Sequence, residues 1–300
     1  MLAIIFLVSL VVFVLGYFIY GRFLDARFQI DDSRPTPAHS DYDGVDRVPA
    51  HKAVLLGHHF SSIAGAGPIV GPIIACVAFG IGPALLWILF GAILIGGVHD
   101  YSALIASVRH KGRSVAEIAR QYLSPVAYKM LLIFIWLALV YVLTVFTDLT
   151  ATTFVQDGGV ASSAIMFMIL AVGFGMSVYR MKIPIITASI IFVPLVFAAI
   201  WLGQIVPIGA EKVPSLLGSP AKTWEIILII YCFVASTTPV WILLQPRDYL
   251  SSYLLYASVV VGFIGIIAGG FALQAPVFKG WNDPQVGTLF PMLFITIACG

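Results

Sequence analysis

Apolar runs of about twenty residues, repeated along the whole chain, constrain its fold more than any other feature. A helix of about 20 apolar residues crosses the roughly 30 Å hydrocarbon core of a bilayer. Only 10% of the 300 residues are charged, far fewer than the roughly 25% of a soluble globular protein. The sequence therefore predicts an all-α, polytopic integral membrane protein. The predicted spans are residues 2–20, 53–78, 82–108, 125–150, 161–178, 182–204, 224–248 and 252–274.

The first and last apolar runs differ from the others. The run at 2–20 has no basic region before it and no small-residue cleavage site after it, which predicts a retained helix rather than a signal peptide. A further run at 286–300 has 15 residues, short of the roughly 20 that a span needs. We therefore expect the chain to be a fragment that ends inside a helix.

Lysine and arginine are distributed unevenly between alternating loops, with 13 in one set and 3 in the other. The positive-inside rule places the N-terminus outside and the basic loops, including a polar linker at 21–52, in the cytoplasm. One basic loop contains SVAEIARQYL, in which Ser114 can cap a helix and Glu117 follows three residues later. This pattern predicts a short interfacial helix near 114–123.

Two predicted spans are interrupted by helix-breaking residues. The segment SSIAGAGPIVGP occupies 61–72, and STTP and QPRD interrupt the apolar run at 229–250. Proline removes a hydrogen-bond donor from a helix, and backbone groups released in this way must face protein, water or a ligand inside a membrane. Each interruption therefore predicts a cavity. The alternative is that proline and small residues only allow the helices to pack closely.

The spacing of the two interrupted spans suggests an internal repeat. The second is the sixth span counted from the first, so the two cross the membrane in opposite directions, as an inverted repeat requires. This predicts a LeuT-like five-plus-five core preceded by one extra helix at 1–20. Its first repeat would occupy 53–222, and its second repeat, truncated, would occupy 223–300.

Exposed backbone groups at the ends of half-helices suit an anionic group of a substrate. The predicted substrate-binding residues are Ser61, Ser62, Gly65, Gly67, Ser236, Thr237 and Thr238. The hydroxyl groups at the second interruption can equally repair broken backbone hydrogen bonds.

Ionisable residues at similar predicted depth form a second set of candidates: His58, His59, His99 and Asp100. A histidine near a carboxylate can carry a proton near neutral pH, which suggests an ion-coupling site. The same four residues can instead satisfy backbone groups, or bind a divalent metal such as zinc, although no HExxH spacing is present. For Arg247 and Asp248 the sequence suggests either a cytoplasmic gate or a simple interfacial ion pair.

Three ordered segments carry a family resemblance: VPAHKAVLLGHHFSSIAGAGPIVGP, GPALLWILFGAILIGGVHDYSALIASVRHKGRSVAEIAR and QPRDYLSSYLL. Together they resemble the carbon starvation protein A family. The resemblance implies a bacterial inner-membrane carrier for small peptides, with relatives that are proton-coupled carriers of pyruvate. Members of that family are longer than 300 residues, so we expect a five-plus-five core to lack the rest of its eighth helix and the two that follow.

The leading interpretation is a secondary carrier, not an enzyme, that alternates access around the two interruptions and couples a small peptide or carboxylate to protons. The alternatives are an intramembrane metal-binding protein or metalloenzyme built on the His and Asp cluster, and a passive channel. The formal net charge of +2 and the lack of a basic patch interleaved with aromatic residues argue against a nucleic-acid partner.

Overall fold

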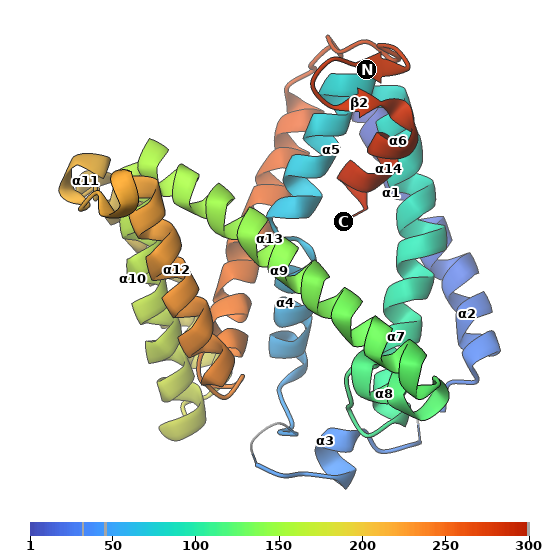
Figure 1. Ribbon diagram of the computed structural model, residues 1–300, viewed down its shortest axis with the longest axis vertical. Helices are drawn as coiled ribbons and strands as arrows, with labels where there is room; N and C mark the ends of the chain where they lie inside the picture. Colours follow the sequence, from blue (N-terminus) through green and yellow to red (C-terminus); the bar gives the residue numbers. More distant parts are fainter. Residues whose placement is uncertain (32, 45–46, 299–300) are drawn as a thin grey trace. The chain divides into compact units, whose positions relative to one another are not determined.

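The structure is a computed structural model that describes residues 1–31, 33–44 and 47–298. Its regular structure is almost entirely helical (Figure 1), which confirms the all-α class. Two short strands, β1 (Asn282–Asp283) and β2 (Gly287–Thr288), pair antiparallel. The helices in chain order are α1 (Leu2–Leu15), η1 (Gly16–Tyr20), α2 (Gly21–Phe28), α3 (Pro37–Ser40), α4 (Lys52–Ile63), α5 (Ala66–Phe79), α6 (Ile81–Phe90), η2 (Gly91–Gly96), α7 (Gly97–Arg109), α8 (Val115–Tyr122), α9 (Pro125–Gln156), α10 (Gly158–Gly175), η3 (Met176–Arg180), α11 (Ile185–Ile205), η4 (Ala210–Lys212), η5 (Leu216–Gly218), α12 (Pro220–Thr237), α13 (Leu244–Ala268) and α14 (Leu289–Ile297).

Within the described residues, 7 helical stretches are long and apolar enough to cross a membrane. They confirm a polytopic membrane protein, and six of them correspond to predicted spans, although the first continues to Phe28. Short π-helical turns, η1, η2 and η3, continue three of these helices without a break. The stretches are Leu2–Phe28, Lys52–Phe79, Ile81–Arg109, Pro125–Gln156, Gly158–Arg180, Ile185–Ile205 and Leu244–Ala268.

The first predicted interruption is confirmed. Helix α4 ends at Ile63 and α5 begins at Ala66. Gly65 between them is extended, with φ −77° and ψ −168°. Pro68 falls in the first turn of α5, where a missing N–H costs no intrahelical hydrogen bond, and Pro72 lies within the helix.

The second predicted interruption is only partly correct. The helix breaks after Thr237, as STTP predicts, but QPRD does not break it, because residues 245–248 form the first turn of α13. Pro246 is tolerated there because first-turn N–H groups have no partner within the helix. Figure 1 shows α12 running downwards and α13 starting at its lower end and running upwards. The predicted spans 224–248 and 252–274 were therefore wrongly bounded, and the interruption coincides with a reversal of the chain.

The polar linker begins later than predicted. Helix α2 continues η1, and the helical stretch reaches Phe28 rather than stopping at residue 20. Long charged side chains such as Arg22 and Arg27 can extend to the membrane surface while their backbone stays helical. The helix ends where Gln29 adopts a left-handed conformation with φ 50°. A short helix is present where the interfacial helix near 114–123 was predicted, as α8, and its place at the membrane interface stays a prediction.

Contacts divide the chain into two compact units. The first unit comprises Met1–Tyr42, Ser62–Tyr122 and Leu255–Gly300, and the second comprises Asp43–Ser61 and Leu123–Leu254. In the first unit α14 packs against α5 and α6 around Phe79, Leu289 and Leu293. Gly71 allows this approach, since a Cβ there would lie 1.9 Å from the Thr296 carbonyl oxygen.

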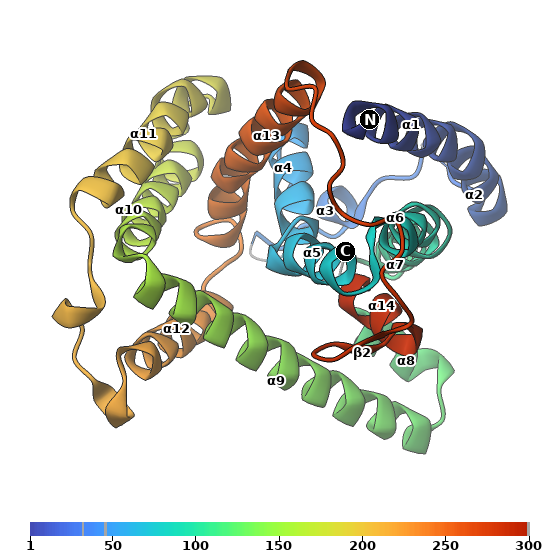
Figure 2. The same ribbon diagram turned by 90° about the horizontal axis from the view of Figure 1, so that it is seen from above.

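The second unit is built on α9, α10, α11, α12 and the first turns of α13, together with most of α4. Helices α10 and α11 pack side by side (Figure 2). A buried cluster that includes Phe174, Val54 and Leu250 joins α10 to α4 and α13. This cluster sets the position of α4 against α13, where the candidate site lies.

Candidate functional site

The candidate site lies in the second unit, where α4 packs against the first turns of α13. Gly57 makes the close approach possible, because a Cβ there would lie 2.9 Å from the Ser252 hydroxyl and 3.2 Å from the Tyr249 ring. The next residue, His58, therefore reaches α13. Its Nδ1 atom lies 2.7 Å from Oδ2 of Asp248.

Asp248 is the centre of the site. Its side chain is only 8% exposed, and its second oxygen, Oδ1, accepts a hydrogen bond from Nε of Arg247 at 2.8 Å. Nη2 of Arg247 also lies 2.8 Å from Oδ1. Nη1 of Arg247 donates to the Tyr231 hydroxyl on α12 at 3.1 Å. One buried carboxylate is thus shared between a histidine and an arginine, which we call the shared-carboxylate site.

Protonation of His58 changes the total charge of this site. Nδ1 and a carboxylate oxygen would repel each other at 2.7 Å if both were bare acceptors, so Nδ1 carries a proton. Among the described residues Nδ1 has no well-aligned hydrogen-bond acceptor, so its attraction to Asp248 depends on charge more than on direction. With Nε2 unprotonated the three side chains sum to zero charge, and with Nε2 protonated they sum to +1.

Hydroxyl groups extend the polar region along the same helices. The Ser61 and Ser251 hydroxyls are in hydrogen-bond contact between α4 and α13. The Tyr249 hydroxyl pairs with that of Ser189 on α11 at 2.8 Å and with that of Tyr253 at 2.8 Å. Polar groups in a membrane helix are costly unless paired, and these face one another inside the second unit.

The other candidate residues predicted near the first interruption, His59 for ion coupling and the rest for substrate binding, take different positions. His59 and Ser62 are exposed. Gly65 precedes the first turn of α5, and Gly67 lies within that turn, where backbone N–H groups have no intrahelical acceptor.

The hydroxyl groups at the second interruption point back to their own helix. Ser236 donates to the Phe233 carbonyl at 2.8 Å, and Thr237 and Thr238 donate to the Val234 carbonyl at 2.9 and 2.8 Å. These bonds satisfy carbonyl groups at the end of α12, which is the backbone-repair alternative. Their role as substrate ligands stays a prediction.

His99 and Asp100 lie on α7 in the first unit, whereas His58 and His59 lie on α4 in the second unit. His99 Nδ1 and Asp100 Oδ1 lie 2.9 Å apart, and both side chains are well exposed. Among the described residues no three His, Cys, Asp or Glu side chains are gathered as metal ligands. A joint coupling or metal site of these four residues stays a prediction.

Sequence reasoning identified His58 but missed its partner. The predicted ion pair of Arg247 and Asp248 is confirmed, yet it was assigned to the membrane surface and not connected with His58. One signal was available, because an ionisable residue inside a membrane span needs an oppositely charged or polar partner. Asp248 and His58 are both ionisable residues within mostly apolar helices. They were therefore candidates to pair.

The helices and the paired charges between them define a class, the multi-pass helical membrane proteins with ionisable residues inside their spans. More narrowly, the chain belongs to the carbon starvation protein CstA family, whose model matches residues 1–300. This confirms the resemblance found in the sequence. No solved structure matches the chain.

Relatives of this family carry transport names. The chain is 36% identical over 297 residues to the peptide transporter CstA of Campylobacter jejuni, covering 96% of this chain and 42% of that protein. It is 35% identical over 301 residues to the peptide transporter CstA of Bacillus subtilis, covering 97% and 49%. It is 33% identical over 299 residues to the pyruvate/proton symporter BtsT of Escherichia coli K12, covering 97% and 41%. The chain thus spans less than half the length of these relatives.

Proposed function

We propose that the protein is part of a secondary carrier of the bacterial inner membrane that moves a small peptide or small carboxylate together with protons. The observation that carries this proposal is the shared-carboxylate site, where His58 and Arg247 hold one buried carboxylate. A peptide transporter and a pyruvate/proton symporter among the relatives support the substrate class.

Coupling follows from competition for Asp248. When Nε2 of His58 takes up a proton, the imidazolium attracts Asp248 more strongly than the neutral ring does. The ion pair between Asp248 and Arg247 then weakens, and N–H donors of the Arg247 guanidinium become free to bind another carboxylate. A guanidinium binds a carboxylate through parallel N–H groups, so the substrate carboxylate, of a peptide C-terminus or of a small acid, takes that place.

Proton and substrate binding therefore favour each other. Coupling of this kind is reciprocal, so a bound substrate anion also raises the affinity of His58 for a proton. Coupling free energies are typically about 1–3 kcal/mol, which corresponds to roughly 5–150-fold in affinity. With a monocarboxylate such as pyruvate, the fully loaded site carries no net charge beyond that of the empty one, which suits movement across the membrane.

The two interruptions supply the remaining substrate contacts in this proposal. The first turn of α5, with Gly65 and Gly67, presents backbone N–H groups, and Ser61 and Ser62 precede it. Ser236, Thr237 and Thr238 lie at the second interruption. The carrier alternates access around these segments, within an inverted five-plus-five repeat and with the N-terminus outside. The opposite directions of α4 and α12 that the sequence predicts support this topology.

Uptake into proteoliposomes tests the proposal. Radiolabelled pyruvate and dialanine are offered with an inwardly directed pH gradient, and accumulation of either is expected to collapse when the gradient is removed. His58→Gln should abolish the response to the gradient. His59→Gln is the matched control, since His59 is adjacent on α4 but exposed, and it should respond as the unaltered protein does. Equal responses of both variants would contradict the coupling role.

A further inference from the structure

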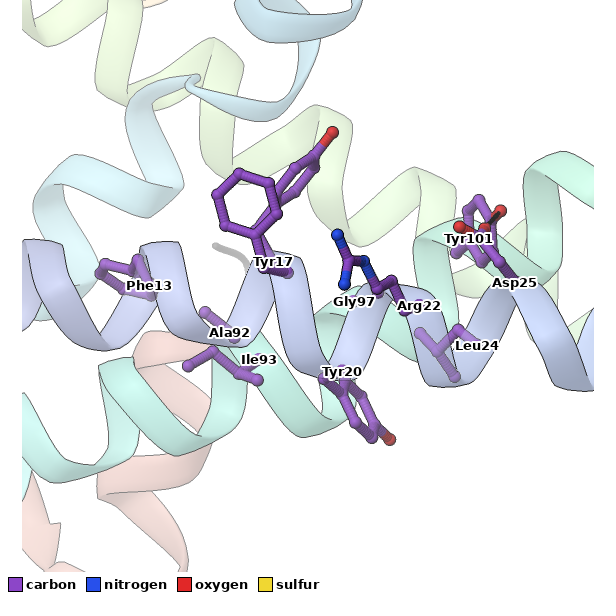
Figure 3. A pocket seen from close by; sticks show the side chains of 13 residues that line it. Phe13, Tyr17, Tyr20, Arg22, Leu24, Asp25, Ala92, Ile93, Gly97 and Tyr101 are labelled. Carbon is purple, nitrogen blue, oxygen red and sulfur yellow. Dashed lines mark hydrogen bonds between the residues drawn. The ribbon is translucent and has the colours of Figure 1, made fainter.

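A groove in the first unit has no part in the proposed transport site. It lies between the N-terminal helix, from α1 through η1 to α2, and the helix formed by η2 and α7, and it has a volume of about 620 Å³. Figure 3 shows its lining side chains. All residues of α1 and η1 are described and none is buried, so one wall of the groove is an exposed helix that is long and apolar enough to cross a membrane.

The groove is apolar at one end and polar at the other. Phe13, Tyr17 and Ile93 line the apolar part, whereas Arg22 and Asp25 line the opposite end. The 12 steps from Phe13 to Asp25 rise about 18 Å along a helix at 1.5 Å per residue. One leaflet of a bilayer has about 15 Å of hydrocarbon, half of the roughly 30 Å core. The length of the groove therefore matches the thickness of one leaflet.

Among the described residues, Arg22 is the charged group of this groove that has no partner. It makes no hydrogen bond or ion pair within the part of the chain that the structure describes, and Figure 3 shows its guanidinium projecting from the same side of the helix as Tyr17. Asp25 instead accepts a hydrogen bond from the Tyr101 hydroxyl of α7. As far as the described residues show, the polar end thus offers one free cation beside a carboxylate that is already engaged.

The other charged groups near this end are also occupied. Arg27 stacks on the Phe23 ring, 5.2 Å from its centre. Arg109 donates to the carbonyl groups of Phe28 and Gln29, which fixes α7 to the end of α2. On α7, His99 and Asp100 contact each other. Arg22 is accordingly the group to which an added anion can bind.

Glycine residues keep the groove open. A Cβ on Gly16 would lie 2.9 Å from the Ile93 side chain, so the two helices touch there. A Cβ on Gly21, which also lines the groove, would meet nothing within 4 Å. The helices therefore meet at Gly16 and leave a hollow beside Gly21, next to Arg22.

We propose that this groove binds an anionic phospholipid, with its phosphate on Arg22 and an acyl chain along Phe13, Tyr17 and Ile93. The unpartnered cation at the surface end and the apolar lining at leaflet depth match the two halves of such a lipid. Basic pockets between membrane helices are known to bind anionic headgroups in this way. The bound lipid fixes the N-terminal helix against α7.

Native mass spectrometry tests the proposal with protein released from micelles that contain phosphatidylglycerol and phosphatidylcholine. The unaltered protein is expected to retain phosphatidylglycerol preferentially. Arg22→Gln should lower that retention about tenfold, the loss expected for one charge-assisted contact. Arg27→Gln is the matched control, because it removes an equal charge from the same helix outside the groove, and it should leave retention unchanged.

Gly21→Leu provides a second, independent variant. It keeps every charge and fills the hollow, so retention of phosphatidylglycerol should fall although Arg22 is intact. Equal retention by Arg22→Gln and Arg27→Gln would overturn the proposal, whether or not Gly21→Leu folds. Competition by inorganic phosphate at equal concentration would also overturn it, because the groove would then bind a soluble anion rather than a lipid.

Discussion

Replacing Asp248 by asparagine removes the charge that holds the shared-carboxylate site together. The new amide would keep the shape of the side chain but leave Arg247 and a protonated His58 without a counter-ion. Breaking a buried ion pair by removing one partner costs about 3–5 kcal/mol. His58 and Arg247 are each about one-third exposed (33% and 32%), and solvent reduces the cost, so we expect about 2–3 kcal/mol.

Thermal unfolding in detergent, followed by size-exclusion fluorescence, measures this effect. A change of 1 kcal/mol shifts the melting temperature by about 2–4 °C in domains of 150–250 residues, so Asp248→Asn should lower it by roughly 5 °C or more. Asp100→Asn is the matched control, since Asp100 also contacts a histidine, at 2.9 Å, but its side chain is 52% exposed. Exposed pairs contribute about 0–1 kcal/mol, so that variant should melt within about 4 °C of the unaltered protein.

A double variant separates lost charge from lost packing. Arg247→Gln combined with Asp248→Asn removes both charges, so it should be more stable than Asp248→Asn alone, because no uncompensated arginine remains. Equal melting temperatures for Asp248→Asn and Asp100→Asn would refute this reasoning, as would a double variant that is the least stable of the three.

Three further predictions concern packing, capping and pH. Gly71→Ala places a Cβ 1.9 Å from the Thr296 carbonyl oxygen and should cost about 1–3 kcal/mol in thermal unfolding, the usual range for overpacking; a melting temperature equal to that of the unaltered protein would contradict it. Ser114→Ala removes the acceptor of the α8 cap and should cost about 1 kcal/mol of local stability, seen as faster amide exchange in α8 with no change in α9. Backbone N–H groups, that of Gln285 first, donate to Asp283 and lower the pKa of its carboxyl group below its ordinary value. The turn should therefore be fully stabilised above pH 3.8 and lose this stabilisation as pH falls further. The chemical shift of the Gln285 amide reports this change, and Asp283→Asn should remove its pH dependence.

Features fixed by local chemistry were predictable from the sequence. Apolar run length located the first six spans, and the Ser114 cap located α8, where the Glu117 N–H donates to the Ser114 hydroxyl at 3.3 Å. The glycines and prolines of 61–72 located the first interruption for the same reason, since they act on their own backbone.

The second interruption was misplaced because proline has two possible effects. Within a helix it breaks the hydrogen-bond ladder, but in the first turn it costs nothing. Pro239 and Pro246 both lie in the run at 229–250, and the sequence does not state which of them ends a helix. The structure places Pro239 between the helices and Pro246 in the first turn of α13.

The partner of His58 depends on packing between segments far apart in the chain. His58 and Asp248 meet because Gly57 lets α13 approach closely, with Tyr249 and the Ser252 hydroxyl beside it. Estimated depth in the membrane instead grouped His58 with His99 and Asp100. Depth restricts one coordinate only, whereas pairing also depends on which helices are neighbours.

Proton movement driven by substrate is the most direct test of the claim that His58 carries the coupled proton. Proteoliposomes that contain a pH-sensitive dye are given pyruvate or dialanine without an imposed pH gradient, and acidification of the interior is recorded together with substrate uptake. We expect acidification by the unaltered protein and by His59→Gln, and none by His58→Gln at any level of uptake. Acidification by His58→Gln in proportion to its uptake would contradict the claim.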